Sequence, residues 1–329
     1  MYRFFILFLL LSLSCGEHKP EPTMETQKNK KLVIAHRGAS GYLPEHTLPA
    51  KAMAYAMGAD YLEQDIVLSK NNVPIVIHDI HLETVTDVAQ KFPKRKRSDG
   101  RYYVIDFTFE ELKQLNVSER FDSATNKAVF PNRFPVFTSN FKLHSLREEI
   151  EFIQGLNKST GKKIGIYPEI KEPEFHQKEG KDISNIVLKV LNDYGYKTKK
   201  DNCILQCFDA KELKRIRNEF KSELFLVQLM EFKTDEKLEE IATYADGIGP
   251  WVHQIIKEKD INGKWQITDL VANAHKLNLK VHAYTFRADQ LGDFDSFEAL
   301  LQVALYEANV DGVFTDFPEK TVAFVDKKE

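Results

Sequence analysis

The sequence has few cysteines and little net charge. Its 329 residues include three cysteines, and the formal charge is -3 at pH 7. A small negative charge argues against nucleic acid as the main partner, so an anionic ligand would have to be held by local cations. With 43% hydrophobic and 29% charged residues, the chain can bury a large core. It could form one large domain of the α/β barrel size class or two domains of ordinary size.

The sequence also has little that could span a membrane. The apolar run Phe4–Leu13 follows a basic start and is too short to cross a bilayer, so residues 1–15 are interpreted as a signal peptide. The run ends at Ser14-Cys15-Gly16, which resembles the signal of bacterial lipoproteins. We expect lipidation at Cys15, an exported periplasmic or outer-membrane lipoprotein, and membrane contact through that anchor only. Ordinary cleavage is the alternative. Residues 16–30 would form a flexible tether.

The two remaining cysteines are predicted to be buried thiols without a disulfide. If residues 204–208 form a strand, Cys203 and Cys207 lie four residues apart along it, too far to bridge. A zinc site is not expected because no histidine or cysteine cluster lies near them in sequence.

The segment Tyr61–Val67 is predicted to be a β-strand with two acidic side chains on one face. Alternate side chains of a strand share a face, so Glu63 and Asp65 point the same way. Two neighbouring carboxylates on an inward face repel each other unless a cation or a proton neutralises them. We interpret the pair as half of a metal site. An edge strand with an acidic solvent face is the alternative.

Further functional side chains follow the first predicted strand. Leu32–Ala35 runs directly into His36-Arg37-Gly38, and catalytic groups in parallel α/β folds concentrate where strands end. His36 could instead be a core histidine, whereas an arginine at a strand end indicates an anionic partner. Thr47 is predicted to cap a helix over Leu48–Met57.

The link Ser69–Asn72 predicts a hairpin, because it is too short for a parallel crossover. The returning segment Val73–Asp79 would bring His78 back near Glu63, beside the carboxylates. The alternative is that His78 merely ends an exterior hairpin.

Residues 80–142 break the strand and helix rhythm and predict an inserted subdomain over the barrel mouth. The basic run Lys94–Arg97 is expected to be a solvated loop, with contact to anionic lipid headgroups as the alternative.

The rhythm resumes after residue 142, where strand Lys163–Lys171 places Glu169 and Lys171 on one face. Without the hairpin return, eight strands alternate with helices. The predicted fold is therefore a TIM (β/α)8 barrel over residues 31–329, with the insertion at 80–142 after a hairpin that follows strand 2. The other expected elements are strands at 203–208, 224–229, 247–249, 280–285 and 312–315 and helices at 144–159, 183–194, 210–220, 235–244, 268–277 and 296–308.

Together these segments predict hydrolysis of a phosphate ester. Three carboxylates at strand ends are hard oxygen ligands, which suit Ca²⁺ or Mg²⁺ better than zinc or copper. Two cations beside them would hold a phosphate whose charge the metal neutralises, and two histidines would act as general base and general acid. The residues assigned are Glu63, Asp65 and Glu169 for the metal, Arg37 and Lys171 for the phosphate, and His36 and His78 for proton transfer.

These motifs resemble the glycerophosphodiester phosphodiesterase family over residues 32–318. The segments that carry the resemblance are His36-Arg37-Gly38, Pro44–Thr47, Glu63-x-Asp65, His78-Asp79, Glu169-x-Lys171 and Asp311–Pro318, and segments 40–47, 175–182 and 206–209 are similar to its exported branch. The resemblance implies the same residue roles, a divalent metal with Ca²⁺ favoured over Mg²⁺, and hydrolysis of glycerophosphodiesters such as glycerophosphocholine to sn-glycerol 3-phosphate and an alcohol.

Three aromatic residues and one glutamate complete the expected site. Phe208 and Tyr284 stand at strand ends and are predicted to form an apolar wall against glycerol, although core packing explains them almost as well. Tyr284 stands where many cytosolic relatives have tryptophan, and Trp251 is a weaker candidate. Glu45 could be a further metal ligand, but we favour a role in orienting Arg37.

Two other functions stay open. One is a phospholipase acting on intact lipid, and the other is a surface lipoprotein without turnover, against which the full set of histidines and carboxylates argues. The route of hydrolysis is also open. We favour attack by the glycerol 2-hydroxyl to give a cyclic phosphate, because a neighbouring hydroxyl brings a large effective concentration. Equal cleavage of a substrate that lacks this hydroxyl would contradict that route.

Overall fold

The structure is a computed structural model, and it describes residues 30–231 and 237–328. The expected signal peptide, Cys15 and the tether up to residue 29 lie outside the described residues. Within the two described ranges, no helix is both long enough and apolar enough to cross a bilayer.

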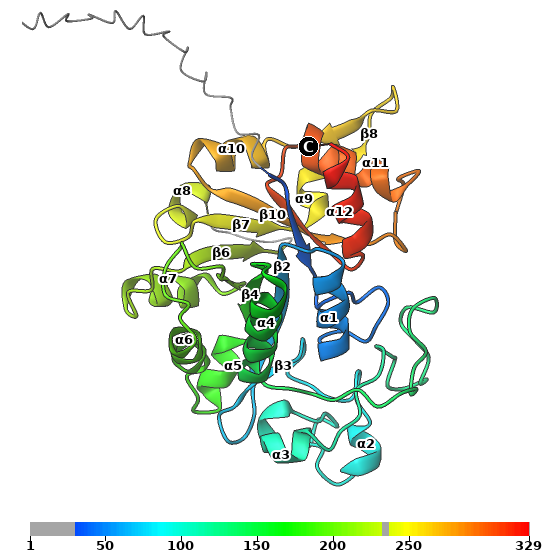
Figure 1. Ribbon diagram of the computed structural model, residues 1–329, viewed down its shortest axis with the longest axis vertical. Coiled ribbons are helices and arrows are strands. Elements are labelled where there is room, and N and C mark those ends of the chain that lie inside the picture. The colour runs from blue at the N-terminus through cyan, green and yellow to red at the C-terminus, as the bar shows by residue number, and fades with distance from the viewer. Residues whose placement is uncertain (1–29, 232–236, 329) are drawn as a thin grey trace, which may run out of the picture.

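Parallel strands close into an eight-stranded barrel, which confirms the predicted fold (Figure 1). The strands are hydrogen-bonded in the order β1-β11-β10-β7-β6-β5-β4-β2, and pairing of β1 with β2 closes the ring. Their bounds are β1 (Leu32–Ala35), β2 (Tyr61–Leu68), β4 (Gly165–Ile170), β5 (Ile204–Cys207), β6 (Phe225–Met230), β7 (Gly247–Pro250), β10 (Lys280–Phe286) and β11 (Gly312–Thr315). Cys203 and Cys207 are buried free thiols, as predicted.

Helices cover the outside of the barrel, and several of them begin at side-chain caps. Thr47 accepts a hydrogen bond from the backbone N–H of Ala50, as predicted, and Ser145 and Glu148 form a capping box. Gly161, with φ of 74°, ends the helix that Ser145 begins. The barrel helices are α1 (Leu48–Ala56), α4 (Leu146–Thr160), α5 (Pro173–Lys178), α6 (Ile183–Asp193), α7 (Ala210–Asn218), α8 (Leu238–Ile241), α10 (Leu270–Lys276), α11 (Phe297–Gln302) and α12 (Pro318–Asp326).

Two expected helices differ from the structure. The helix expected at 296–308 is α-helical only in α11 and continues as a π-helix, η2 (Val303–Glu307), which apolar spacing does not distinguish from an α-helix. The helix expected at 235–244 is observed as the short α8, and residues 235–236 lie outside the described ranges.

A hairpin between β7 and α10 was not predicted. There α9 (Val252–Ile255) is followed by the antiparallel strands β8 (Ile256–Lys259) and β9 (Trp265–Ile267). Both strands are mostly exposed or partly exposed, so they lack the buried alternation that marks a strand. The pair Asn262-Gly263, with Gly263 at φ of 77°, is the turn signal that could have located the hairpin.

The segment between β3 and α4 forms a layer of its own beside the barrel. β3 (Pro74–Val76) pairs antiparallel with β2, and the chain then forms α2 (Val88–Lys91), the 3-10 helix η1 (Val104–Asp106) and α3 (Phe109–Leu112). Figure 1 shows α2 and α3 apart from the barrel helices. Their apolar side chains join the hairpin in a second buried cluster, separate from the barrel core.

The basic run of this segment is not a wholly solvated loop. Lys94 and Lys96 are exposed, but Arg97 lies 2.7 Å from Asp106 and 2.6 Å from Glu179. Arg95 likewise pairs with a nearby carboxylate. The segment is a loop, as expected, but its two arginines are only partly exposed because alternate side chains turn toward acidic partners.

A buried charged network fixes β2 against the helices behind it. Lys51 of α1 and Glu149 of α4 are fully buried and lie 2.7 Å apart. Gln64 donates to the same carboxylate, and Lys51 also donates to the backbone carbonyl of Glu63. Because the charges are paired and hydrogen-bonded, they hold in place the strand that carries Glu63 and Asp65.

Candidate active site

The structure brings all nine side chains that the sequence assigns to the site into one cavity of about 250 Å³. They come from the carboxyl ends of the strands and from the segment after β3, as expected for a barrel of this kind. The nine are His36, Arg37, Glu63, Asp65, His78, Glu169, Lys171, Phe208 and Tyr284. The roles assigned to these residues stay predictions.

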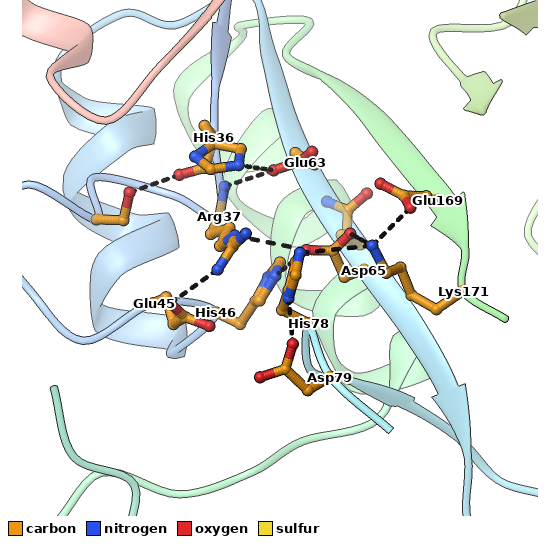
Figure 2. Close-up of polar contacts among 12 residues, drawn as sticks. His36, Arg37, Glu45, His46, Glu63, Asp65, His78, Asp79, Glu169 and Lys171 are labelled. Carbon is orange, nitrogen blue, oxygen red and sulfur yellow. Dashed lines mark hydrogen bonds and ion pairs between the residues drawn. The ribbon is translucent and has the colours of Figure 1, made fainter. Parts of the chain in front are cut away.

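Three carboxylates meet at the centre of the cavity (Figure 2). Glu63 and Asp65 lie on β2, and Asp65 is level with Glu169 on the neighbouring strand β4. Oxygen atoms of all three lie within 4.8 Å of one another, and all three side chains are buried. This proximity follows from the strand pairing, because parallel neighbours in register place their inward side chains at the same height.

The electrostatics of the carboxylate cluster favour a bound cation. Burial raises the pKa of Glu63 well above its usual range, and the charges of Asp65 and Glu169 raise it further. Burial also raises the pKa of Glu169 to about 8, despite the nearby Lys171. One oxygen of Asp65, Oδ1, accepts no hydrogen bond within the described part of the chain. Buried, crowded oxygen atoms with free lone pairs fit a hard divalent cation.

Two cations flank the carboxylates from either side of Asp65 (Figure 2). The backbone N–H of Arg37 donates to Glu63 (2.7 Å), and its Nη1 donates to Glu45 (2.9 Å). This contact places Glu45 beside Arg37, as the favoured role of orienting Arg37 requires, and that role stays a prediction. The Nε of Arg37 has no hydrogen-bond acceptor among the described residues, and Lys171 Nζ lies 2.7 Å from Glu169. A phosphate placed here would find donors on both sides.

Each of the two histidines is backed by an aspartate. His36 Nδ1 lies 2.6 Å from Asp316, and His78 Nδ1 lies 2.5 Å from Asp79. Nε2 of His36 faces the cavity and lies 3.9 Å from Glu63, whereas Nε2 of His78 lies at the cavity wall and accepts a hydrogen bond from Lys171 Nζ (3.4 Å). Burial lowers the pKa of His36, and burial with neighbouring cations lowers the pKa of His78 to about 4. Both imidazoles are therefore neutral near pH 7 and can accept a proton at Nε2.

Sequence reasoning gave neither aspartate a role. Burial acts to raise the pKa of Asp316, but His36 and two arginines, Arg287 and Arg133, hold it well below its usual range. Asp79 is paired with Arg120 at 2.7 Å. The available signal for Asp316 was its position directly after β11, which matches that of His36 after β1.

Two other polar contacts to the carboxylates were also missed. His46 Nε2 lies 2.7 Å from Asp65 Oδ2, and Gln206 donates to Glu63 Oε1 (3.2 Å). Both contacts fix the orientation of a carboxylate at the centre of the cavity. His46 belonged to a recognised motif, and Gln206 is a buried polar residue in the short strand β5, which could have suggested an inward position.

The aromatic residues form a wall on the β5 and β10 side of the cavity. The rings of Phe208 and Tyr284 meet edge to face with centroids 6.0 Å apart, and Lys171 Nζ lies 5.7 Å from the Phe208 centroid. The Tyr284 hydroxyl donates to the backbone carbonyl of Met230 (2.7 Å), and Trp251 also lines the cavity. The wall presents apolar surface beside the charged centre, as a site for a small organic group requires.

A model of the Glycerophosphoryl diester phosphodiesterase family matches residues 36–320. The chain belongs to this family. Family membership makes the protein a phosphodiesterase, and it confirms the resemblance found in the sequence at the level of the family. Membership of the exported branch stays a prediction.

The phosphodiesterase is similar to characterised relatives over nearly its whole length. It is 45% identical over 342 residues to a glycerophosphodiester phosphodiesterase of Haemophilus influenzae, with 94% of each chain covered. It is 38% identical to one of Treponema pallidum, covering 91% of this chain and 93% of that one. Its fold is similar to that of an Oleispira antarctica phosphodiesterase solved in complex with the product sn-glycerol-3-phosphate. In that comparison the TM-score is 0.63, the identity is 21%, and 90% of this chain and 97% of that one are covered.

Proposed function

We propose that this phosphodiesterase hydrolyses glycerophosphodiesters to sn-glycerol 3-phosphate and a free alcohol, with a divalent metal and two histidines. The observation that carries the proposal is the cluster of Glu63, Asp65 and Glu169, flanked by cations and faced by two aspartate-backed imidazoles. The names of the two relatives and the product held by the Oleispira antarctica phosphodiesterase support the choice of substrate.

The carboxylate cluster would hold the metal, and Ca²⁺ is favoured over Mg²⁺. Ca²⁺ accepts six to eight oxygen ligands in irregular arrangements, including bidentate carboxylates, whereas Mg²⁺ requires a near-ideal octahedron and keeps several waters. Three carboxylates from two neighbouring strands suit the less demanding ion. When bound, the metal neutralises phosphate charge and polarises the ester.

The side chains of the protein would position the diester and transfer its protons. Arg37 and Lys171 bind the non-bridging phosphate oxygens from opposite sides. One histidine accepts the proton of the attacking hydroxyl at Nε2. The other takes up a proton from solvent at Nε2, which the negative charge of the bound phosphate favours, and passes it to the departing alcohol oxygen. The aspartates bound at Nδ1 keep each Nε2 directed at the substrate and stabilise the imidazolium that forms.

A direct assay tests this function. The full chain is expected to release sn-glycerol 3-phosphate from glycerophosphocholine with Ca²⁺ present, and to lose that activity when a chelator removes the metal. Little activity is expected on phosphatidylcholine vesicles, because a cavity of about 250 Å³ with a charged centre is too small to enclose two acyl chains. Undiminished turnover in chelator would refute the metal role, and preference for the vesicles would favour the phospholipase.

We also propose that the protein is exported and anchored through Cys15, with residues 16–30 as the tether. The support is the sequence of residues 1–16. The mature protein is expected to begin with a lipid-modified Cys15, which mass spectrometry of the purified protein measures. Cys15→Ala is expected to move the enzyme from the membrane fraction to the soluble fraction. An unmodified mature N-terminus at another residue would refute the anchor.

A further inference from the structure

A second cavity, of about 230 Å³, lies beside the active-site cavity and shares part of its wall. The shared residues are His36, Arg37, His78 and Arg287. Much of the remaining wall comes from the segment between β3 and α4, through Glu119, Arg120, Phe130 and Arg133. Both histidines therefore border both cavities, so a phosphate held between them has space on two sides.

The four arginines that line this second cavity already have carboxylate partners. The pairs are Arg37 with Glu45 (2.9 Å), Arg120 with Glu45 (2.6 Å), Arg133 with Asp316 (2.7 Å) and Arg287 with Asp316 (2.9 Å). Their positive charge is largely compensated, so the cavity is not an evident site for a second anion.

Glu119 is the acidic side chain of this wall that forms no ion pair within the described residues. Its side chain is buried, with 2% of the residue exposed, and its Oε2 accepts no hydrogen bond within the described chain. Burial and the charge of Glu45 raise the pKa of Glu119 to about 8, although Arg133 and the backbone N–H and side chain of Arg120 act in the opposite direction. Without a ligand the side chain is therefore mostly protonated near pH 7. A cation that entered the cavity would supply the missing partner.

We propose that this cavity receives the alcohol half of the diester, and that Glu119 selects alcohols that carry an ammonium group. The proposal rests on the proposed function, because it assigns one ester arm to each cavity. With the phosphate between His36 and His78, the glycerol arm lies against the wall of Phe208 and Tyr284. The departing alcohol then lies in the second cavity.

The chemistry of the two kinds of alcohol explains the expected selectivity. Choline and ethanolamine carry a positive charge two carbons from the ester oxygen. This charge favours the ionised form of Glu119 and can pair with it in a poorly hydrated wall, where such attraction is strong. Glycerol and inositol are neutral and gain no charge pairing there. Substrates with an ammonium group should therefore bind better than neutral ones of similar size.

A substrate comparison tests the proposal. Glu119→Gln is expected to lower kcat/KM for glycerophosphoethanolamine roughly 30-fold, mainly through KM, and to change that for glycerophosphoglycerol by less than about twofold. Glu174→Gln is the matched control, because Glu174 is an exposed carboxylate on a wider cavity on the other side of Lys171. The control variant should change neither value.

The outcomes are distinguishable. Equal loss on both substrates with Glu119→Gln would show a structural role and overturn the proposal, as would no loss on either. A selective loss with Glu174→Gln alone would place the alcohol in the wider cavity and overturn it too. A wild-type enzyme inactive on both diesters would instead refute the proposed function.

Inhibition of the wild-type enzyme gives a test that does not depend on a variant folding correctly. Choline and 3,3-dimethylbutan-1-ol have the same shape, but only choline is charged. The inhibition constant of choline against hydrolysis of glycerophosphoglycerol is expected to be about tenfold lower than that of the neutral alcohol. The difference should vanish in Glu119→Gln. Equal inhibition by the two alcohols in the wild type, or none by choline, would overturn the proposal.

Discussion

His36→Ala is expected to lower kcat for glycerophosphocholine by about 100- to 10,000-fold, the range that a positioned acid or base contributes. The reason lies in its hydrogen bonds. Asp316 binds Nδ1 of His36 at 2.6 Å and is itself held by two arginines, so Nε2 is fixed toward the cavity. No other described histidine except His78 borders the cavity, so nothing nearby can take over the proton transfer.

The chain contains a matched control for this variant. His275 also pairs with an aspartate, Asp311, at 2.8 Å, but Asp311 precedes β11 and so lies at the opposite end of the barrel from Asp316. His275→Ala removes the same kind of contact and should leave kcat within about twofold of the wild type, since surface changes away from a site have small effects. Steady-state assays of both variants make the comparison. Equal losses would show that the effect of His36→Ala comes from damage to the fold.

Glu63→Gln is expected to lower kcat/KM by about 100-fold or more, because a metal that polarises a phosphoryl oxygen contributes several kcal/mol. Burial and two neighbouring carboxylates raise the pKa of Glu63 well above its usual range. Its charge destabilises the metal-free protein, and a bound cation relieves that destabilisation. Replacing Glu63 should therefore weaken metal binding. It should also stabilise the metal-free protein, because it removes the repulsion between Glu63 and the carboxylates of Asp65 and Glu169.

Thermal melting separates these two consequences. Adding Ca²⁺ is expected to raise Tm of the wild type, because a ligand bound to the folded state stabilises it. In Glu63→Gln the metal-free Tm should be higher than that of the wild type, and the shift with Ca²⁺ should be largely lost. Glu174→Gln, at an exposed position, should behave as the wild type. A full Ca²⁺ shift retained in Glu63→Gln would exclude that residue as a metal ligand.

Much of the site could be predicted because its residues follow short, buried strands. The alternation of β2 places Glu63 and Asp65 on one face, and the same alternation in β4 places Glu169 beside Lys171. Since the carboxyl ends of parallel strands meet at one end of a barrel, residues more than 100 positions apart were expected to converge. The structure places all of them in one cavity.

The partners of those residues were not predictable in the same way. Asp316 reaches His36 across 280 residues, and His46 reaches Asp65 from the loop before α1. Neither contact follows from strand periodicity. Glu119 is a still clearer case, because its position depends on how an irregular segment with its own apolar cluster packs against the barrel.

The order of apolar strands and helices, with charged residues at the strand ends, was enough by itself to determine the barrel and the residues at its mouth. Local periodicity fixes which way a side chain points, and parallel pairing fixes which end it reaches. Tertiary structure alone decided which aspartate supports His36, which arginines are already neutralised, and which carboxylate is left without a partner. Those outcomes depend on distances between loops, and no repeating pattern in a single sequence encodes such distances.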